Sequence, residues 1–209
     1  MSSWIPRTTR TGIEYGQAEA QYYWDTGWNP GASFDNNLGT YDLALPNCTT
    51  YAYGRVQEMG APAPISGWHN ASAWDSYLIN SWTWINYNEA YLEVGDLVVW
   101  DSNSRNHVAV VEVISGGNIY VSESYYTSDN GTASGDRSPG VWGATKQSVN
   151  DYGVQNYPNR YFHYGLITFA YGVLPDKILK NPVNYDSPGT LKIFAGMMSR
   201  KRRRRKIYV

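Results

Sequence analysis

The single cysteine of this 209-residue chain, Cys48, lies in the stretch NCTTYAYGR, after a loop and at the start of a helix-like pattern. A thiol in the first turn of a helix faces unpaired backbone N–H groups and the positive end of the helix dipole, and both favour the thiolate. One cysteine cannot form a disulfide within the chain, so Cys48 is a buried apolar side chain, a reactive thiol or an intermolecular partner. Its position suits a nucleophile.

A thiolate that attacks an amide also needs a base or an imidazolium partner, and the chain offers three histidines. His69 lies in a predicted loop, His163 lies beside a predicted late strand, and His107 opens the strand-like run HVAVVEVI. A side chain at the mouth of a strand can point past the edge of a sheet toward the end of a packed helix. His107 is therefore the favoured partner of the thiol.

A carboxylate on the next strand is the candidate that orients His107. The runs HVAVVEVI and NIYVSESYY are joined by residues 115–117, which predicts a β-hairpin. If all three residues form the loop, Ile114 pairs with Asn118, and His107 lies diagonally from Glu123 on one face. A two-residue loop would shift the register by one residue and put Glu123 on the opposite face. The apolar alternation along NIYVSESYY favours the longer loop, because an acid on an apolar face is costly to bury without a partner such as histidine.

The elements that position these residues follow from periodicity and turn signals. A helix is predicted over residues 48–59, with Gly60 as its stop, and a shorter helix over residues 71–79. Residues 14–23 are compatible with a further helix. Strands are predicted at residues 97–100, 107–114 and 118–126, with a final strand within residues 162–172. Helices first and strands after indicate an α+β fold.

Length and composition predict one core. A chain with 42% hydrophobic residues and 17% charged residues is long enough to bury one. Beyond about residue 172 no periodic apolar segment is long enough for a second core. We therefore predict an N-terminal arm at residues 1–13, a catalytic domain at residues 14–172, and a C-terminal arm with a basic tail at residues 173–209.

The order of four motifs, NCTTYAYGR, GDLVVW, HVAVVEV and YVSES, resembles the CHAP domain, the cysteine, histidine-dependent amidohydrolase/peptidase family. The resemblance covers about residues 14 to 170. It implies a papain-like α+β fold of the NlpC/P60 type, with N-terminal helices packed on a central antiparallel sheet. It also implies hydrolysis of amide bonds in bacterial peptidoglycan, with Cys48 as nucleophile, His107 as base and Glu123 as orienting residue. Tyr125 departs from the family, which often has an asparagine at that position.

Aromatic residues are candidates for substrate contact. The chain holds nine tryptophans and nineteen tyrosines, and aromatic rings stack on sugars. Tyr125 and Trp100 are the predicted substrate-binding residues, and Trp68 and Trp142 are further candidates for a glycan groove. Packing in the core or at an interface explains the same composition, and is the favoured reading for the tryptophans in general.

No cofactor or metal is expected. The stretch SFDNNLGTYD places oxygen ligands at Asp35, Asn37 and Asp42, but it lacks the glycine and the bidentate glutamate of a strong calcium loop. Turn formation, in which Asn and Asp side chains bond to their own backbone, is the favoured explanation.

Charge divides the chain into two parts. Residues 200–206 carry seven of the seventeen basic residues, which leaves ten basic against eighteen acidic residues, a net charge of −8, elsewhere. The basic run could bind a partner protein, an anionic wall polymer or, less favoured, nucleic acid. The first residues show no signal-peptide pattern and no window is apolar enough for a membrane span, so neither export nor membrane insertion is expected.

These features lead to a functional expectation with alternatives. We expect a phage virion-associated tail lysin that cleaves peptidoglycan at the host cell wall during entry and contacts other virion proteins through its C-terminal arm. One alternative is a free endolysin with the same chemistry, held in the host cytoplasm before lysis. The other is a non-catalytic structural or wall-binding virion protein on the same fold. Amidase and endopeptidase specificity both stay open, as do the host and the oligomeric state.

Overall fold

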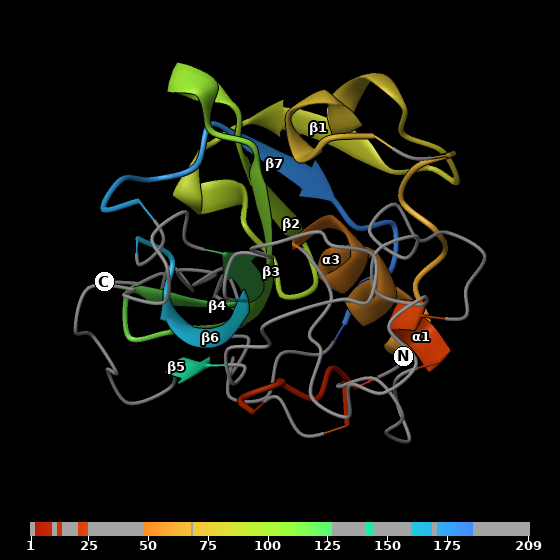
Figure 1. Cartoon of the computed structure of the whole chain (residues 1–209). Helices are drawn as coiled ribbons and strands as arrows, with labels where there is room; N and C mark the ends of the chain where they lie inside the picture. The colour runs from red at the N-terminus through yellow and green to blue at the C-terminus, as the bar shows by residue number, and fades with distance from the viewer. Residues whose placement is uncertain are drawn as a thin grey trace, which may run out of the picture.

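The structure is a computed structural model that describes residues 3–9, 12–13, 21–24, 48–67, 69–126, 141–143, 160–168 and 171–185. Within these residues a seven-stranded sheet has the order β1-β7-β2-β3-β4-β6-β5, and every pairing is antiparallel (Figure 1). The strands are β1 (Thr83–Asn86), β2 (Leu97–Trp100), β3 (His107–Ser115), β4 (Asn118–Tyr126), β5 (Val141–Gly143), β6 (Arg160–Leu166) and β7 (Lys177–Lys180). The helices are α1 (Gln21–Trp24), α3 (Cys48–Glu58) and the 3-10 helices η2 (Ala71–Ser76), η3 (Glu89–Tyr91) and η4 (Ser102–Ser104). The predicted α+β class is confirmed.

Helix α3 packs on strands β3 and β4 and carries Cys48 as its first residue. Every residue from Thr49 to Val56 is buried, so the helix lies in the core for most of its length. The helix ends at Glu58, and the N–H groups of Gly60 and Ala61 bond back to its last turn. The predicted helix and its glycine stop are therefore confirmed, and they fix the end of the helix that presents the thiol.

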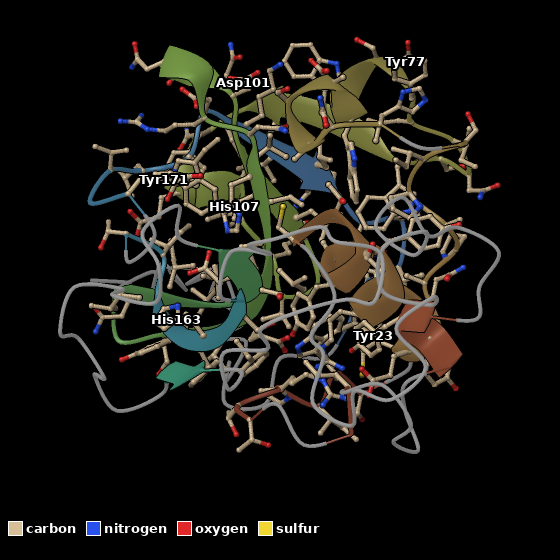
Figure 2. All side chains as sticks on the ribbon, in the orientation of Figure 1. Tyr23, Tyr77, Asp101, His107, His163 and Tyr171 are labelled. Atoms are coloured by element: carbon tan, nitrogen blue, oxygen red, sulfur yellow. The ribbon has the colours of Figure 1, made fainter. Side chains whose placement is uncertain are left out.

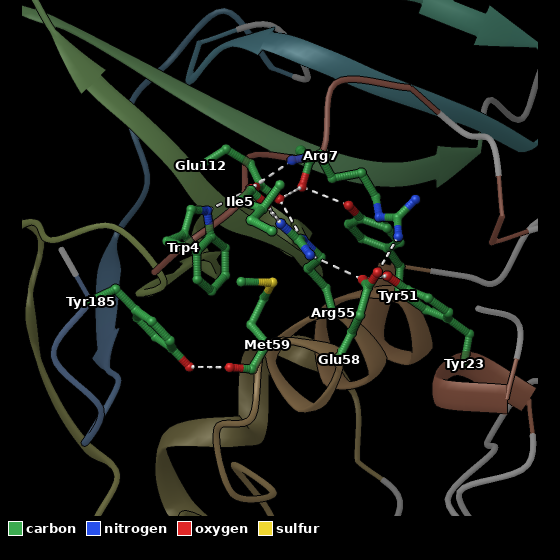
Figure 3. A network of polar contacts seen from close by, with 11 residues as sticks. Trp4, Ile5, Arg7, Tyr23, Tyr51, Arg55, Glu58, Met59, Glu112 and Tyr185 are labelled. Carbon is green, nitrogen blue, oxygen red and sulfur yellow. Dashed lines mark hydrogen bonds and ion pairs between the residues drawn. The ribbon is translucent and has the colours of Figure 1, made fainter. Parts of the chain in front are cut away.

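A buried polar network fastens α3 to the sheet (Figure 3). The Arg55 guanidinium donates to both carboxylate oxygens of Glu112, from Nε to Oε1 and from Nη2 to Oε2, each at 2.9 Å. Trp4 Nε1 and Ser122 Oγ donate to the same carboxylate at 2.8 and 2.6 Å. Glu112 raises the pKa of Arg55 above its ordinary value although burial opposes this. Arg55 therefore stays charged inside the core.

The short second helix differs from its prediction. An α-helix was predicted over residues 71–79, whereas the structure has the 3-10 helix η2 over Ala71–Ser76. Its hydrogen bonds span three residues, as from Tyr77 N to Trp74 O at 3.0 Å. Leu78, two residues after η2, pairs with Ile65 in a β-bridge, so the segment is too short for a stable α-helix.

The β3–β4 hairpin also differs from its prediction, although its register near the site does not. Residues 116–117 form a two-residue loop in which both glycines have positive φ, and Ser115 is still paired. The predicted three-residue loop is wrong. A β-bulge at Glu112 then shifts the register by one residue, so that Val110 pairs with Ser122. This is the register that the longer loop would have given.

Strand β7, which is near the end of the described residues, lies inside the sheet. It pairs with β1 on one side and with β2 on the other, and Ile178 and Leu179 are fully buried. The Asp96 carboxylate accepts from Asn181 N at 3.0 Å and pairs with Lys180 Nζ at 2.5 Å. The predicted boundary at residue 172 is therefore wrong, because β7 belongs to the domain and not to an appended arm.

The N-terminal segment also belongs to the domain. Trp4 and Ile13 are buried in the core cluster between α3 and the sheet, together with Tyr51 and Val56. The predicted arm at residues 1–13 is thus an integral part of the fold in the portion that the structure describes. A second apolar cluster, which includes Trp100 and Val121, covers the opposite face of the sheet.

Candidate active site

Cys48 and His107 meet where the start of α3 reaches the start of β3. Cys48 is partly exposed, and its Sγ lies 4.0 Å from the carbonyl oxygen of Asn106. Cys48 lies near enough to His107 to raise the pKa of its imidazole, and His107 is 3% exposed. Because His107 Nε2 is engaged elsewhere, Nδ1 is the ring nitrogen available to the thiol. The juxtaposition expected from the sequence is therefore present.

Glu123 holds the other side of the His107 ring. His107 Nε2 lies 2.5 Å from Glu123 Oε2, and His163 Nδ1 lies 2.8 Å from Glu123 Oε1. Glu123 is fully buried, so its two oxygens are taken up by two imidazoles and not by solvent. Figure 2 shows His107 and His163 on neighbouring parts of the sheet, where β4 lies between β3 and β6.

The electrostatics of His107 and Glu123 favour the charged forms of both groups. Burial opposes a charged His107, but its interactions with Cys48 and Glu123 outweigh this effect and raise the pKa of His107 to about 10. Burial likewise opposes a charged Glu123, but hydrogen bonds from His107 and His163 lower its pKa to about 2. At neutral pH the site therefore contains a His107 imidazolium between the Glu123 carboxylate and the Cys48 side chain.

Neighbouring residues fix the start of β3. The Asn106 side chain accepts from Ser72 N at 2.9 Å and so ties η2 to the residue before His107. Lys177 Nζ pairs with Asp75 at 2.6 Å and with Asp101 at 2.5 Å, which joins β7 to η2 and to the end of β2. These contacts leave the strand start little freedom to move away from α3.

Trp100 does not lie where it was predicted to act. Its ring is fully buried, pairs with His107 across β2 and β3, and donates from Nε1 to Val173 O at 3.0 Å. It therefore packs against the His107 ring, and because it is buried its own ring is not accessible to a sugar. The exposed aromatic residue at this position is Tyr171, which is 39% exposed and meets the His107 ring edge-on at 5.8 Å between centroids (Figure 2).

Several candidates fall outside the described part of the structure. The backbone of Tyr125 lies in β4 and pairs with Tyr161, but its side chain is among the parts not described. The side chain of Trp142 is likewise not described. Trp68, the residues of the suggested calcium loop (Asp35, Asn37 and Asp42) and the basic run 200–206 lie outside the described residues.

Two further structural findings concern metal and membrane binding. Among the described residues, no cluster of three or more His, Cys, Asp or Glu side chains is arranged to hold a metal ion. No helix in the same part of the chain has the length and apolar character needed to cross a bilayer.

Sequence reasoning missed His163 and Tyr171 as members of the site. His163 was weighed only as an alternative base, whereas it is the direct cross-strand partner of Glu123 in the β4–β6 pairing. A prediction that β6 pairs with β4 would have put the two side chains on one face. No pattern in the sequence marks Tyr171, because it follows β6 in a turn.

Comparison with known families gives a match to one family model. Residues 37–125 match the family model of the CHAP domain, a range that contains Cys48, His107 and Glu123. No curated protein and no solved structure matches the chain. The match supports the presence of a CHAP domain in residues 37–125 of this chain.

Proposed function

We propose that this protein hydrolyses an amide bond of bacterial peptidoglycan, with Cys48 as the nucleophile on a papain-like (NlpC/P60-type) fold. The family match supports a cysteine, histidine amidohydrolase or peptidase that acts on peptidoglycan. The observation that carries the proposal is the position of His107, which lies beside Cys48 and bonds through Nε2 to Glu123. A buried, ion-paired histidine beside a partly exposed thiol is the arrangement that thiol hydrolases need.

The reaction follows from this arrangement. The Cys48 thiolate attacks the carbonyl carbon and forms a C–S bond, and the carbonyl oxygen takes up the negative charge of a tetrahedral intermediate. The His107 imidazolium then gives its proton to the leaving nitrogen as the C–N bond breaks. Water, deprotonated by the neutral His107, attacks the resulting thioester and releases the acid and the free thiolate. Glu123 holds the His107 ring in place and stabilises its positive charge in both steps.

The start of α3 supplies the oxyanion site. Backbone N–H groups in the first turn of a helix lack partners within that helix and point outward from its N-terminus. Cys48 is the first residue of α3, so these N–H groups lie beside the sulfur. One such donor contributes about 3 kcal/mol to stabilising the transition state.

The surface beside His107 is proposed to contact the substrate. Tyr171, Val173 and Leu174 are all exposed and follow one another along one segment. The Arg105 guanidinium lies over the Tyr171 ring at 5.4 Å. An aromatic face with an adjacent cation suits a peptide stem that carries carboxylates next to apolar side chains. Tyr125 stays a proposed substrate contact on the neighbouring strand.

The bond and the mode of delivery are finer proposals. The bond lies between muramic acid and alanine for an amidase, and within the stem or cross-bridge for an endopeptidase. For delivery we favour a phage virion tail lysin, because the basic run at residues 200–206 and the acidic remainder suit docking to other particle proteins. A free endolysin is the alternative. Detection of the protein in purified particles separates the two.

The decisive experiment uses purified cell wall and three variants. Cys48→Ala and His107→Ala should each abolish the clearing of a wall suspension, whereas His69→Ala should leave it unchanged, because His69 stacks on Tyr77 and not on the thiol. Mass spectrometry of the released fragments identifies the bond. Full activity of the Cys48 variant would end the thiol mechanism, and wall binding without any released fragment would indicate a non-catalytic protein.

A further inference from the structure

The described part of the molecule contains a second histidine that faces the site without touching the thiol. We propose that His163 is a positioning residue, which locks the Glu123 carboxylate so that one oxygen always faces His107. The inference rests on the proposed function, and it extends the three-residue site to four residues drawn from α3, β3, β4 and β6.

The geometry of Glu123 is the first support. Its Oε1 bonds to His163 Nδ1 at 2.8 Å and its Oε2 bonds to His107 Nε2 at 2.5 Å. A carboxylate bonded through both oxygens cannot turn about its terminal bond without losing both contacts. Because Glu123 is fully buried, no solvent replaces a lost partner. His163 is itself 3% exposed, so its ring is shielded from solvent like the Glu123 carboxylate that it positions.

The second support is Gly165, two residues after His163 on the same face of β6. A methyl group added to Gly165 would lie within contact distance of His163 Nε2 and 2.8 Å from its Cε1. Gly165 is not among the glycines with positive φ, so the backbone does not require a glycine there. The glycine therefore makes room for the imidazole, whose Nδ1 lies 2.8 Å from Glu123 Oε1. Sequence and fold together reserve this space for the ring.

The chemical consequence concerns the charge on Glu123. The groups that face it are His107 from β3 and His163 from β6, while Cys48 acts on it through His107. Without a donor at the position of His163 Nδ1, a buried anionic oxygen has no partner, and the neutral acid is favoured. A protonated Glu123 cannot stabilise the His107 imidazolium. In a variant that lacks the His163 donor, the ion pair of Cys48 and His107 should therefore be lost at a higher pH than in the wild type as the pH falls.

The test compares two substitutions of His163. His163→Leu removes the donor at similar size, and His163→Asn keeps an N–H at the position of Nδ1. For His163→Leu we expect kcat to fall about 10- to 100-fold with little change in KM, and the acid limb of the rate profile to move up by about one pH unit. His163→Asn should recover most of both effects.

A second readout does not depend on the substrate. Cys48 is the single cysteine of the chain, so the pH dependence of its alkylation by iodoacetamide can be followed by mass spectrometry. The acid limb of alkylation should move in the same direction in His163→Leu. A wild-type protein that releases no wall fragments would contradict the proposed hydrolase, while the alkylation profile would still decide the role of His163.

Gly165→Ala provides a variant that leaves His163 in place and only displaces its ring. It should move the acid limb of the rate and alkylation profiles in the same direction by a smaller amount. This variant tests the proposal even if His163→Leu does not fold. Leu166→Ala is the matched control, because Leu166 is the adjacent residue of β6 and is 48% exposed. Wild-type profiles in both His163→Leu and Gly165→Ala would overturn the proposal. Equal defects in the Leu and Asn variants of His163 would show a packing role and overturn it as well.

Discussion

Two glutamates of one hairpin, Glu112 on β3 and Glu123 on β4, are both fully buried. They differ in their partners. Glu112 is gripped by the guanidinium of Arg55, while Glu123 lies between two imidazoles. An arginine cannot release its proton at accessible pH, whereas a histidine can. The comparison teaches that the partner decides whether a buried carboxylate fastens the fold or takes part in proton transfer.

The largest expected effect comes from removing the negative charge of Glu123, the proposed orienting residue of His107. Glu123→Gln should lower kcat for wall hydrolysis by about 10³- to 10⁴-fold, because the amide neither stabilises the His107 imidazolium nor fixes the ring as the carboxylate does. The rate of fragment release measures this, with thermal unfolding as the control for folding. A variant within tenfold of the wild type would remove Glu123 from the mechanism.

The corresponding change at Glu112 should affect the fold and spare the chemistry. Glu112→Gln leaves the Arg55 charge buried without its counter-charge, so the free energy of unfolding should fall by about 3 to 5 kcal/mol. Urea unfolding measures the loss, and kcat per folded molecule should stay close to the wild-type value. Arg55→Met with Glu112→Leu should recover part of the stability, because no charge is then buried alone. A large fall in kcat without a loss of stability would show that the Glu112 network also contributes to catalysis, and would contradict the comparison.

The pH dependence sharpens the same contrast. The folded-state pKa of His107, about 10, lies above its ordinary value of 6.5, so its stabilising contribution is complete below 6.5 and is lost as pH rises through about 10. The folded-state pKa of Glu123, about 2, lies below its ordinary value of 4.5, so its contribution is complete above 4.5 and is lost as pH falls through about 2. The alkaline limb of activity should move down in Glu123→Gln and stay in place in Glu112→Gln, as a pH–rate profile will show.

The smallest expected effect lies outside both networks, at Tyr171. Tyr171→Ala should lower kcat/KM by about 2- to 10-fold through the loss of its exposed aromatic face, and Tyr171→Phe should not. Kinetics on soluble wall fragments measure the difference. Equal losses in both variants would point to the hydroxyl group and against an aromatic contact.

Local patterns predicted the parts of the site that are local in sequence. The helix that begins at Cys48 and stops before Gly60, and the strand that begins at His107, follow from turn residues and periodicity. The contact of His107 with Glu123 was predicted from a three-residue loop. That loop is wrong, but the register that it implied near the site is right. The loop has two residues, and the bulge at Glu112 restores the register. A bulge is stabilised by the packing of Arg55 and Trp4 around the extra residue, and no pattern along the strand encodes that.

Long-range pairings account for what the sequence did not predict. Strand β7 has four residues, too short a run to distinguish from a loop, and its place between β1 and β2 is decided by distant partners. To predict the contact of His163 with Glu123, one would have to know that β6 pairs with β4. Trp100 is predicted to bind substrate but is buried, and composition does not reveal which tryptophans the second apolar cluster covers.

The position of β7 has a consequence for biosynthesis. β7 leaves the ribosome after the other described strands, yet it is the partner that joins β1 to the rest of the described sheet. The hairpin of β3 and β4 can close early from neighbouring residues, whereas the β1 side must wait for residues 177–180. A nascent chain halted before this point would expose the edge of β2, so ribosome-bound intermediates of that length should be the ones most prone to aggregate.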